Sequence, residues 1–183
     1  MHYAGSYNVT TYPAGAATYA TSLGDSDITA IVASVNPTDP NGVYFVLTTP
    51  DVNETSGFCT LYCGWHTHAS INGFDIKYAF VGNPLRCPAA CQAQSPGPNG
   101  SGGGDGLANM IAHELDEAVT DPDFTGWFDT NGKENADKCA WTFGTVYKSS
   151  NGAKANMKLG ALDYLIQQNW VNGKRASCST QWP

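Results

Sequence analysis

Apolar residues recur at helical spacing in two parts of the chain. The first part is residues 25–35, where Asp25 or Ser26 can cap a helix and Asn36-Pro37 ends it. Its apolar positions follow the i, i+3, i+4, i+7 spacing of one helix face and are Ile28, Ile31, Val32 and Val35. We therefore predict a short amphipathic helix in this part of the chain.

The second helical pattern covers residues 105–120, with Asp105 as the expected N-cap and Asp121-Pro122 beyond its end. Its apolar stripe consists of Leu107, Met110, Ile111, Leu115 and Ala118. His113 and Glu117 lie at the margin of this stripe, so we expect both side chains to face a cleft.

Two shorter apolar stretches predict strands. Residues 43–49 form a continuous β-branched and aromatic run, typical of a central strand, whereas residues 74–81 alternate as a strand with one buried face does. Residues 1–22 have no helical period and are expected to form an extended lead-in. Residues 59–68 and 84–106 are expected to be loops, the first of them cross-linked.

Together these elements predict one α/β domain over residues 1–183, with a small mixed sheet packed on the helix at 105–120. The chain is 42% hydrophobic and 14% charged, and its length suits a single core. A net charge of -7 excludes the clustered basic surface that nucleic acid requires. No apolar run is long enough to cross a membrane, and we expect any secretory leader to have been removed.

The six cysteines are an even number in an acidic chain, which favours disulfides in a secreted protein. A structural zinc site is the alternative, but the usual spacing is Cys-x-x-Cys and this chain has Cys-x-x-x-Cys. Six cysteines allow 15 pairings. Our first choice is Cys139 with Cys178, Cys59 with Cys63, and Cys87 with Cys91.

The stretch from His113 to Glu117 carries the sharpest chemical signal. Residues four apart project from one helix face, so His113 and Glu117 could hold one ion, and Zn²⁺ accepts both ligand types at about 2.0–2.2 Å. Glu114 stands where the general base of the His-Glu-x-x-His metalloproteases stands. The second histidine of that motif is a glutamate here. A surface helix with three acids and a histidine is the alternative.

A third ligand is expected from the acid-bearing segment about twenty residues downstream. Asp137 is the first choice and Glu134 the second, and the acid that does not bind metal would be a solvated loop residue. His66 and His68 lie two residues apart, on one side of an extended segment. They could bind a metal, line the cleft or be ordinary polar residues.

Other kinds of chemistry find less support. No Gly-x-Ser-x-Gly motif is present, and the even cysteine count leaves no obvious free thiol. The acids near Glu114 and Glu117 could form the carboxylate pair of a glycosidase, but that hypothesis leaves His113 without a role.

Several separate segments are similar to the EXORDIUM or phosphate-induced protein family. They are Phe58-Cys59, Tyr62–His66, Tyr78–Pro84, Cys87-Pro88, Asp105-Gly106, Ile111–Glu114, Trp127-Phe128, Ala136–Cys139, Tyr164–Gln167, Trp170 and Cys178. The resemblance implies an extracellular, cell-wall-associated protein, since plant members are growth-related wall proteins. It also strengthens the metal hypothesis, because the residues from His113 to Glu117 and the acids Glu134 and Asp137 match positions typical of the family. Family members carry more sequence before residue 1, so we expect a strand of the sheet to be missing or trimmed.

These observations lead to a zincin-like, disulfide-stapled domain and to two functional hypotheses. In the first, the protein is a secreted zinc-dependent hydrolase, most simply a peptidase: His113, Glu117 and Asp137 hold Zn²⁺, Glu114 is the general base and His66 stabilises the oxyanion. Its substrate would be a peptide or a cell-wall polymer, and we expect a monomer. In the second, the protein is a non-catalytic wall-binding or signalling protein with a structural metal. A site closed by a fourth ligand such as His66 favours the second hypothesis.

Overall fold

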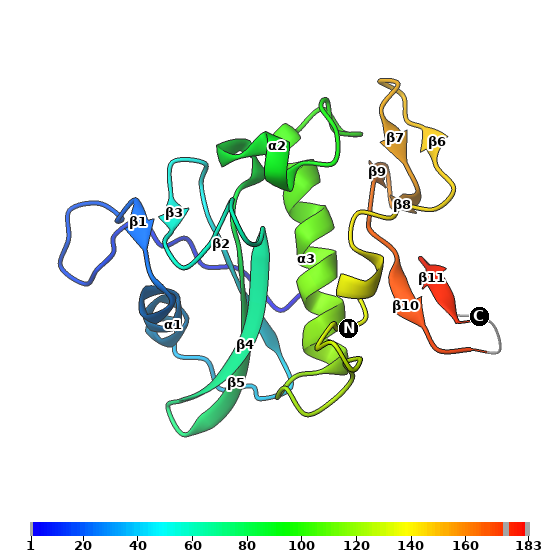
Figure 1. Cartoon of the computed structure of the whole chain (residues 1–183). Helices are drawn as coiled ribbons and strands as arrows, with labels where there is room; N and C mark the ends of the chain where they lie inside the picture. Colours follow the sequence, from blue (N-terminus) through cyan, green and yellow to red (C-terminus); the bar gives the residue numbers. More distant parts are fainter. Residues whose placement is uncertain (1, 174–175, 182–183) are drawn as a thin grey trace.

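A computed structural model describes residues 2–173 and 176–181. A three-stranded sheet lies between two helices, with α1 (Asp25–Ser34) on one face and α3 (Gly102–Thr120) on the other (Figure 1). The strand order is β2 (Val43–Leu47), β5 (Phe74–Val81), β4 (Gly64–Ile71). This arrangement confirms a mixed α/β domain with a small sheet against the 102–120 helix.

Strands β4 and β5 form an antiparallel hairpin, and β2 runs parallel to β5. The hairpin turns at Asn72-Gly73, where φ is 54° and 83°. Positive φ at both central residues suits the tight turn that matches strand twist, and Asn-Gly is the sequence that adopts it most readily. Residues 64–71 are therefore a strand. Our prediction of a loop over 59–68 was wrong for residues 64–68.

The central strand is β5, and our assignment of residues 43–49 to that position was wrong. Ile76, Tyr78, Ala79, Phe80 and Val81 are all buried, which places both faces of β5 against protein. Strand β2 lies at one edge of the sheet, and its side chains are only half-buried or exposed. A continuous apolar run is thus compatible with an edge strand when one of its faces receives a helix.

The main core lies between the sheet and α1. Ile28 and Val32 of α1 pack there with Ile76, Tyr78 and Phe80 of β5. The helix is the predicted one, but its N-cap is Gly24, whose N–H donates to Asp27 Oδ2 at 2.8 Å. The apolar stripe at i, i+3, i+4 therefore predicted the buried face correctly, whereas the cap lies one residue before the expected position.

Helix α3 begins three residues earlier than predicted. Ser101 is its N-cap, and the Ser101 Oγ accepts a hydrogen bond from the N–H of Gly104 at 3.2 Å. Asp105 lies in the first turn instead, where its Oδ2 accepts the N–H groups of Asn99 and Ser101 at 3.0 and 3.2 Å. Asp105 therefore holds the preceding loop against the helix start.

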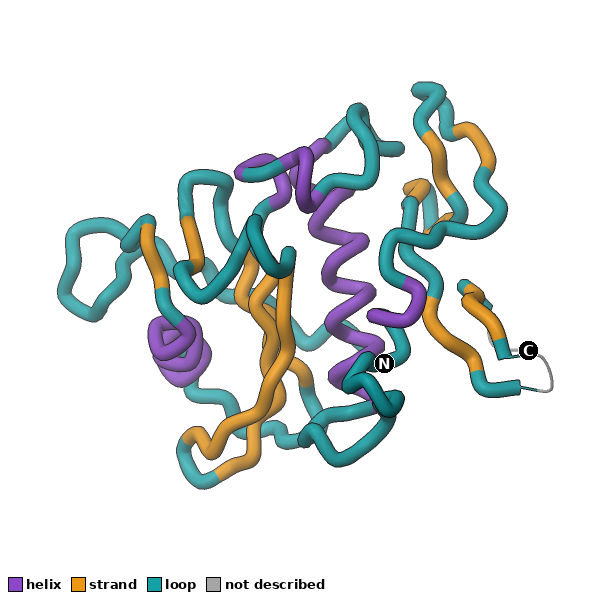
Figure 2. Tube along the Cα trace, in the orientation of Figure 1, coloured by secondary structure: helices purple, strands orange, loops and turns teal. Residues whose placement is uncertain are grey.

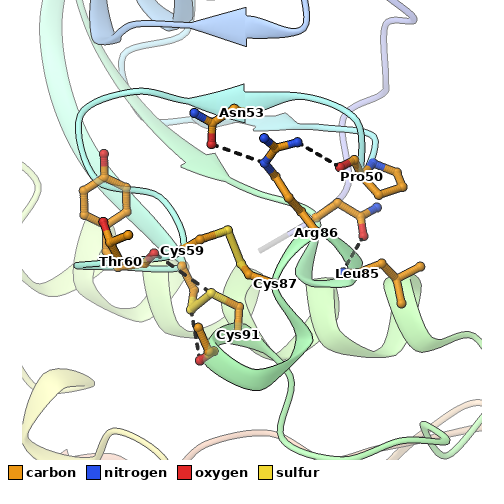
Figure 3. The surroundings of a disulfide bond; sticks show 12 residues. Pro50, Asn53, Cys59, Thr60, Leu85, Arg86, Cys87 and Cys91 are labelled. Atoms are coloured by element: carbon orange, nitrogen blue, oxygen red, sulfur yellow. Dashed lines mark hydrogen bonds between the residues drawn. A yellow bond between two sulfur atoms is a disulfide. The ribbon is translucent and has the colours of Figure 1, made fainter.

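Three disulfides connect the six cysteines, and Figure 3 shows the surroundings of Cys59–Cys87. Cys139–Cys178 confirms the predicted pair. The local pairs were wrong: the bonds are Cys59–Cys87 and Cys63–Cys91, each joining residues 28 apart. Cys87 and Cys91 lie at the two ends of the short helix α2 (Pro88–Cys91), so the i and i+4 positions present both sulfurs to the segment before β4. Two neighbouring bonds therefore fix this segment to α2.

The remaining strands are short and form two-stranded sheets (Figure 2). They are β1 (Ser22–Leu23) with β3 (Asn53–Glu54), β6 (Tyr147–Lys148) with β7 (Lys154–Ala155), β8 (Met157–Leu159) with β9 (Leu162–Tyr164), and β10 (Asn169–Val171) with β11 (Ser177–Ser179). Residues 2–21 carry only an isolated bridge, which agrees with the expected lead-in. Within the described ranges, no helix combines the length and apolar character that crossing a membrane requires.

Candidate metal centre

Helix α3 presents His113 and Glu117 side by side. The His113 Nε2 lies 3.1 Å from Glu117 Oε1, as the i, i+4 spacing predicts. The Glu117 side chain is 6% exposed and that of His113 is 13% exposed. These two groups are therefore in contact and largely removed from water.

Asp137 joins them from a 3₁₀ turn (Asp137–Cys139). Its Oδ1 lies 3.6 Å from His113 Nε2, and its backbone N–H donates to Glu117 Oε1 at 3.1 Å. The neighbouring Asn135 donates to the carboxylate of Asp116, so two contacts hold this segment against α3. The predicted approach of Asp137 to the helix is therefore present.

His66 enters the same region from β4. Its Nε2 lies 3.1 Å from both carboxylate oxygens of Glu134. Side-chain exposure is 3% for His66 and 15% for Glu134, and the ring of Phe124 packs 5.2 Å from the imidazole of His66. Glu134, our second choice of ligand, is thus a half-buried partner of His66 and not a solvated loop acid.

The five residues, which we call the His–carboxylate cluster, form two groups of three. His66, Glu117 and Glu134 make one group, and His113, Glu117 and Asp137 make the other. Within each group the potential ligand atoms lie within 4.8 Å of one another. Imidazole nitrogen and carboxylate oxygen are ligands that Zn²⁺ accepts, so these residues fit the metal that the sequence predicts.

The orientation of the imidazoles agrees with such a site. The Nδ1 atoms of His66 and His113 are buried and have no hydrogen-bond partner. The polar contacts of both rings are therefore made through Nε2, which faces the carboxylates in each case. Two neutral imidazoles would offer their Nε2 lone pairs to the same region.

The cluster concentrates negative charge in a partly dry environment. Burial lowers the pKa of His113, but hydrogen bonds to Asp137 and Glu117 outweigh it and raise the pKa to about 10. The hydrogen bond to His113 in turn lowers the pKa of Asp137. Burial raises the pKa of Glu117. In the ion-free protein His113 is therefore protonated, and its positive charge lies beside Glu117 and Asp137.

Glu114 lies in the wall of a pocket of ≈ 300 Å³ that His113 and Asp137 also line. It is 4% exposed, and burial raises its pKa to about 8, with the nearby Glu117 adding to the shift. Gly64 borders the same pocket, and a Cβ on it would lie 2.8 Å from Glu114 Oε1. The close approach of β4 to α3 at this point requires a residue without a side chain.

A third group of possible ligands lies farther along β4 and β5, and it already contains a cation. His68, Asp75 and Asp123 are within ligand distance of one another, but Lys77 Nζ lies 2.7 Å from Asp75 and 3.1 Å from Asp123. The Lys77 ammonium group already occupies the position between the two carboxylates, where an ion would bind. His68 is therefore separate from the His–carboxylate cluster, although it lies two residues from His66.

Sequence reasoning identified all five members of the cluster but not their pairing. It gave Glu134 and Asp137 as alternatives, whereas the structure places each beside a different histidine. The Asn72-Gly73 turn signal was available and would have placed His66 on a strand. The contact of His66 with Glu134 joins residues 68 apart, and no local pattern predicts it.

Layers of helix and sheet, three disulfides and a partly buried His–carboxylate cluster define a disulfide-stapled α/β domain with a candidate metal centre. Such disulfides are consistent with an extracellular protein. The sequence model of a protein family, described as the phosphate-induced protein 1 conserved region, matches residues 9–180 of this chain. The chain therefore belongs to the phosphate-induced protein 1 family, which confirms the predicted membership.

Curated relatives agree with this assignment. The chain is 35% identical to Protein EXORDIUM-like 3 of Arabidopsis thaliana over 164 residues, which cover 74% of this chain and 48% of the relative. It is 32% identical to Protein EXORDIUM-like 5 of the same plant over 170 residues, covering 76% and 46%, and 28% identical to Protein EXORDIUM-like 4 over 183 residues, covering 87% and 62%. The chain thus spans about half the length of the first two relatives. No solved structure matches it, so the zincin-like arrangement stays a prediction.

Proposed function

We propose that this protein is a non-catalytic extracellular binding or signalling protein, associated with the cell wall, whose His–carboxylate cluster holds a structural divalent cation. The observation that carries the proposal is the position of His66. It reaches the cluster from β4, is 3% exposed, and meets Glu134 from the 134–139 segment. The group of His66, Glu117 and Glu134 is therefore enclosed by protein side chains, and an enclosed site favours a structural metal over a catalytic one.

Such a cation would join three separate parts of the molecule. The cluster takes residues from β4, from α3 and from the segment around Glu134 and Asp137. Zn²⁺ is a metal that accepts both imidazole and carboxylate ligands. The ion would then act as a staple in the same way as the disulfides, with its binding free energy added to folding. The wall association itself comes from the family resemblance, and the relatives' names state no hydrolytic activity.

The proposal predicts that chelation destabilises the folded protein. An ion present at about 1,000 times its Kd stabilises a protein by about 4 kcal/mol, and 1 kcal/mol shifts Tm by about 2–4 °C at this chain length. Treatment with a chelator should therefore lower Tm by about 8 °C or more, and zinc should restore it. A Tm that does not respond to chelator or to added zinc would contradict the structural role.

A second candidate function is zinc-dependent peptide hydrolysis, which one observation favours. Glu114 is buried in the wall of the ≈ 300 Å³ pocket, next to His113 and Asp137, where it could take a proton from a bound water. Bound zinc would supply the lowered pKa of that water. His113 and Asp137 would orient the site, and the pocket would receive the peptide.

Glu114→Gln separates the two functions. The amide keeps the shape of the side chain but cannot accept a proton at neutral pH. If the protein is a hydrolase, this variant should retain its metal and lose the cleavage of a peptide library. If the metal is structural, wild-type protein should cleave nothing above the level of a chelated control, and Glu114→Gln should leave metal content unchanged.

A further inference from the structure

We propose that the His–carboxylate cluster is a binuclear site, in which two divalent cations share Glu117. The inner ion would be bound by His66 and Glu134, the outer ion by His113 and Asp137, and Glu117 would bridge them. This inference rests on the proposed metal function and deepens it, because it assigns a second ion and gives Glu134 and Asp137 separate ligand roles.

The grouping of ligand atoms is the first argument. Ligands bound to one ion at about 2.1 Å can lie no more than about 4.2 Å apart. The potential ligand atoms lie within 4.8 Å of one another in two groups of three, and Glu117 belongs to both groups. The five residues together do not form one such group. One ion would have to leave some of these side chains unbound, whereas two ions use all of them.

Glu117 is placed to bridge. Its Oε1 lies 3.1 Å from His113 Nε2 and accepts the N–H of Asp137, so this oxygen faces the outer group. The second oxygen of Glu117 would bind the inner ion. The ligand atoms of Glu117, His66 and Glu134 lie within 4.8 Å of one another. A carboxylate with one oxygen on each ion is the usual bridge between metals about 3.5–4 Å apart.

The charges of the acids also favour two ions over one. Glu114, Glu117, Glu134 and Asp137 act on one another electrostatically, and each carries one negative charge when ionised. Among the residues that the structure describes, the ion-pair partners of these acids are histidines alone. When all four acids are ionised, which for Glu114 means above its raised pKa of about 8, one divalent ion leaves an excess of two negative charges and two ions balance all four.

The two halves differ in exposure, which gives them different roles. In the inner group the side chains of His66, Glu117 and Glu134 are 3%, 6% and 15% exposed. In the outer group Asp137 is 48% exposed and lines the ≈ 300 Å³ pocket together with His113. The inner ion would be enclosed by protein, whereas the outer ion would keep a position open to the pocket.

Native mass spectrometry of the intact protein tests this directly. The purified protein is stripped with chelator, reloaded with zinc, freed of excess metal and weighed. We expect two zinc ions per chain in the wild type, one in His66→Ala and one in His113→Ala. We expect none, or one bound at least tenfold more weakly, in Glu117→Gln. Circular dichroism and the three intact disulfides confirm that each variant is folded.

His68→Ala is the matched control, since it removes a β4 histidine outside the cluster, and it should retain two ions. Substitution of Mn²⁺ gives a second measurement, because two ions joined by a carboxylate couple magnetically and a single ion does not. One ion in the wild type, removed equally by His66→Ala and His113→Ala, would overturn the binuclear site and leave the structural metal intact. No bound ion would overturn both.

Discussion

Gly64, the first residue of β4, sets how closely the sheet approaches α3. A Cβ at this position would lie 2.8 Å from Glu114 Oε1 and 2.9 Å from the backbone oxygen of Phe80. Glycine is needed here for space, not for an unusual backbone angle. The side chain of Glu114 can lie directly against β4 because Gly64 contributes no side-chain atoms there.

Gly64→Ala should therefore disturb both stability and metal binding. The added methyl group must move either Glu114 or β5, and overpacking of this kind costs about 1–3 kcal/mol. We expect a lower urea midpoint and weaker zinc binding in competition with a chelating dye. Gly173→Ala is the control, because a Cβ there meets nothing within 4 Å. Equal midpoints for the two variants would contradict the close approach.

At the scale of elements, the helices were more predictable than the sheet. The stripe on α3 follows from the 3.6-residue period alone, so His113 and Glu117 could be placed together in advance. The order of β2, β5 and β4 depends on which strands are buried on both faces, and that property belongs to the assembled molecule. The same is true of Cys59 and Cys63, whose partners come from α2.

The pair of bonds between the segment before β4 and α2 should contribute strongly to stability. Cys63–Cys91 connects residues 28 apart, and a loop of this size corresponds to about 3–4 kcal/mol in the chain-entropy model. Replacing both cysteines by serine should lower the free energy of unfolding by about 2–4 kcal/mol. Mass mapping of a non-reduced digest should find Cys59 joined to Cys87 in both proteins. Recovery of a Cys59–Cys63 peptide would contradict the structure.

At the scale of the whole molecule, folding stability should depend on pH in opposite ways with and without an ion. A group whose pKa is higher in the folded than in the unfolded protein stabilises the fold only while it is protonated. The contribution of His113 to folding stability is complete below about pH 6.5 and is lost as pH rises through about 10. The contribution of Glu114 is complete below about pH 4.5 and is lost as pH rises through about 8. The ion-free protein should therefore become less stable as pH rises above about 6.

Bound zinc requires the deprotonated groups, so its affinity should rise over the same range. Each proton released on binding makes affinity up to about tenfold tighter per pH unit. We expect the difference in Tm between zinc-loaded and chelated protein to increase steadily from pH 6 to pH 8.5 in scanning calorimetry. The increase should be smaller in Glu114→Gln, which lacks one of the titrating groups. A difference that stays constant with pH would show that the protons of His113 and Glu114 are not displaced.

Lys77 shows what the His–carboxylate cluster lacks. Beside Asp75 and Asp123 the chain supplies its own positive charge, which is covalently attached and present wherever the protein goes. In the described residues, no lysine or arginine forms an ion pair with Glu117, Glu134 or Asp137. The positive charge beside Glu117 and Asp137 is instead the proton of His113, which a bound ion would displace, so the metal content of the surrounding fluid would become part of the folding equilibrium. Two molecules of identical sequence in media of different metal content would differ in rigidity. The rigidity of the protein would therefore depend on the concentration of cations around it.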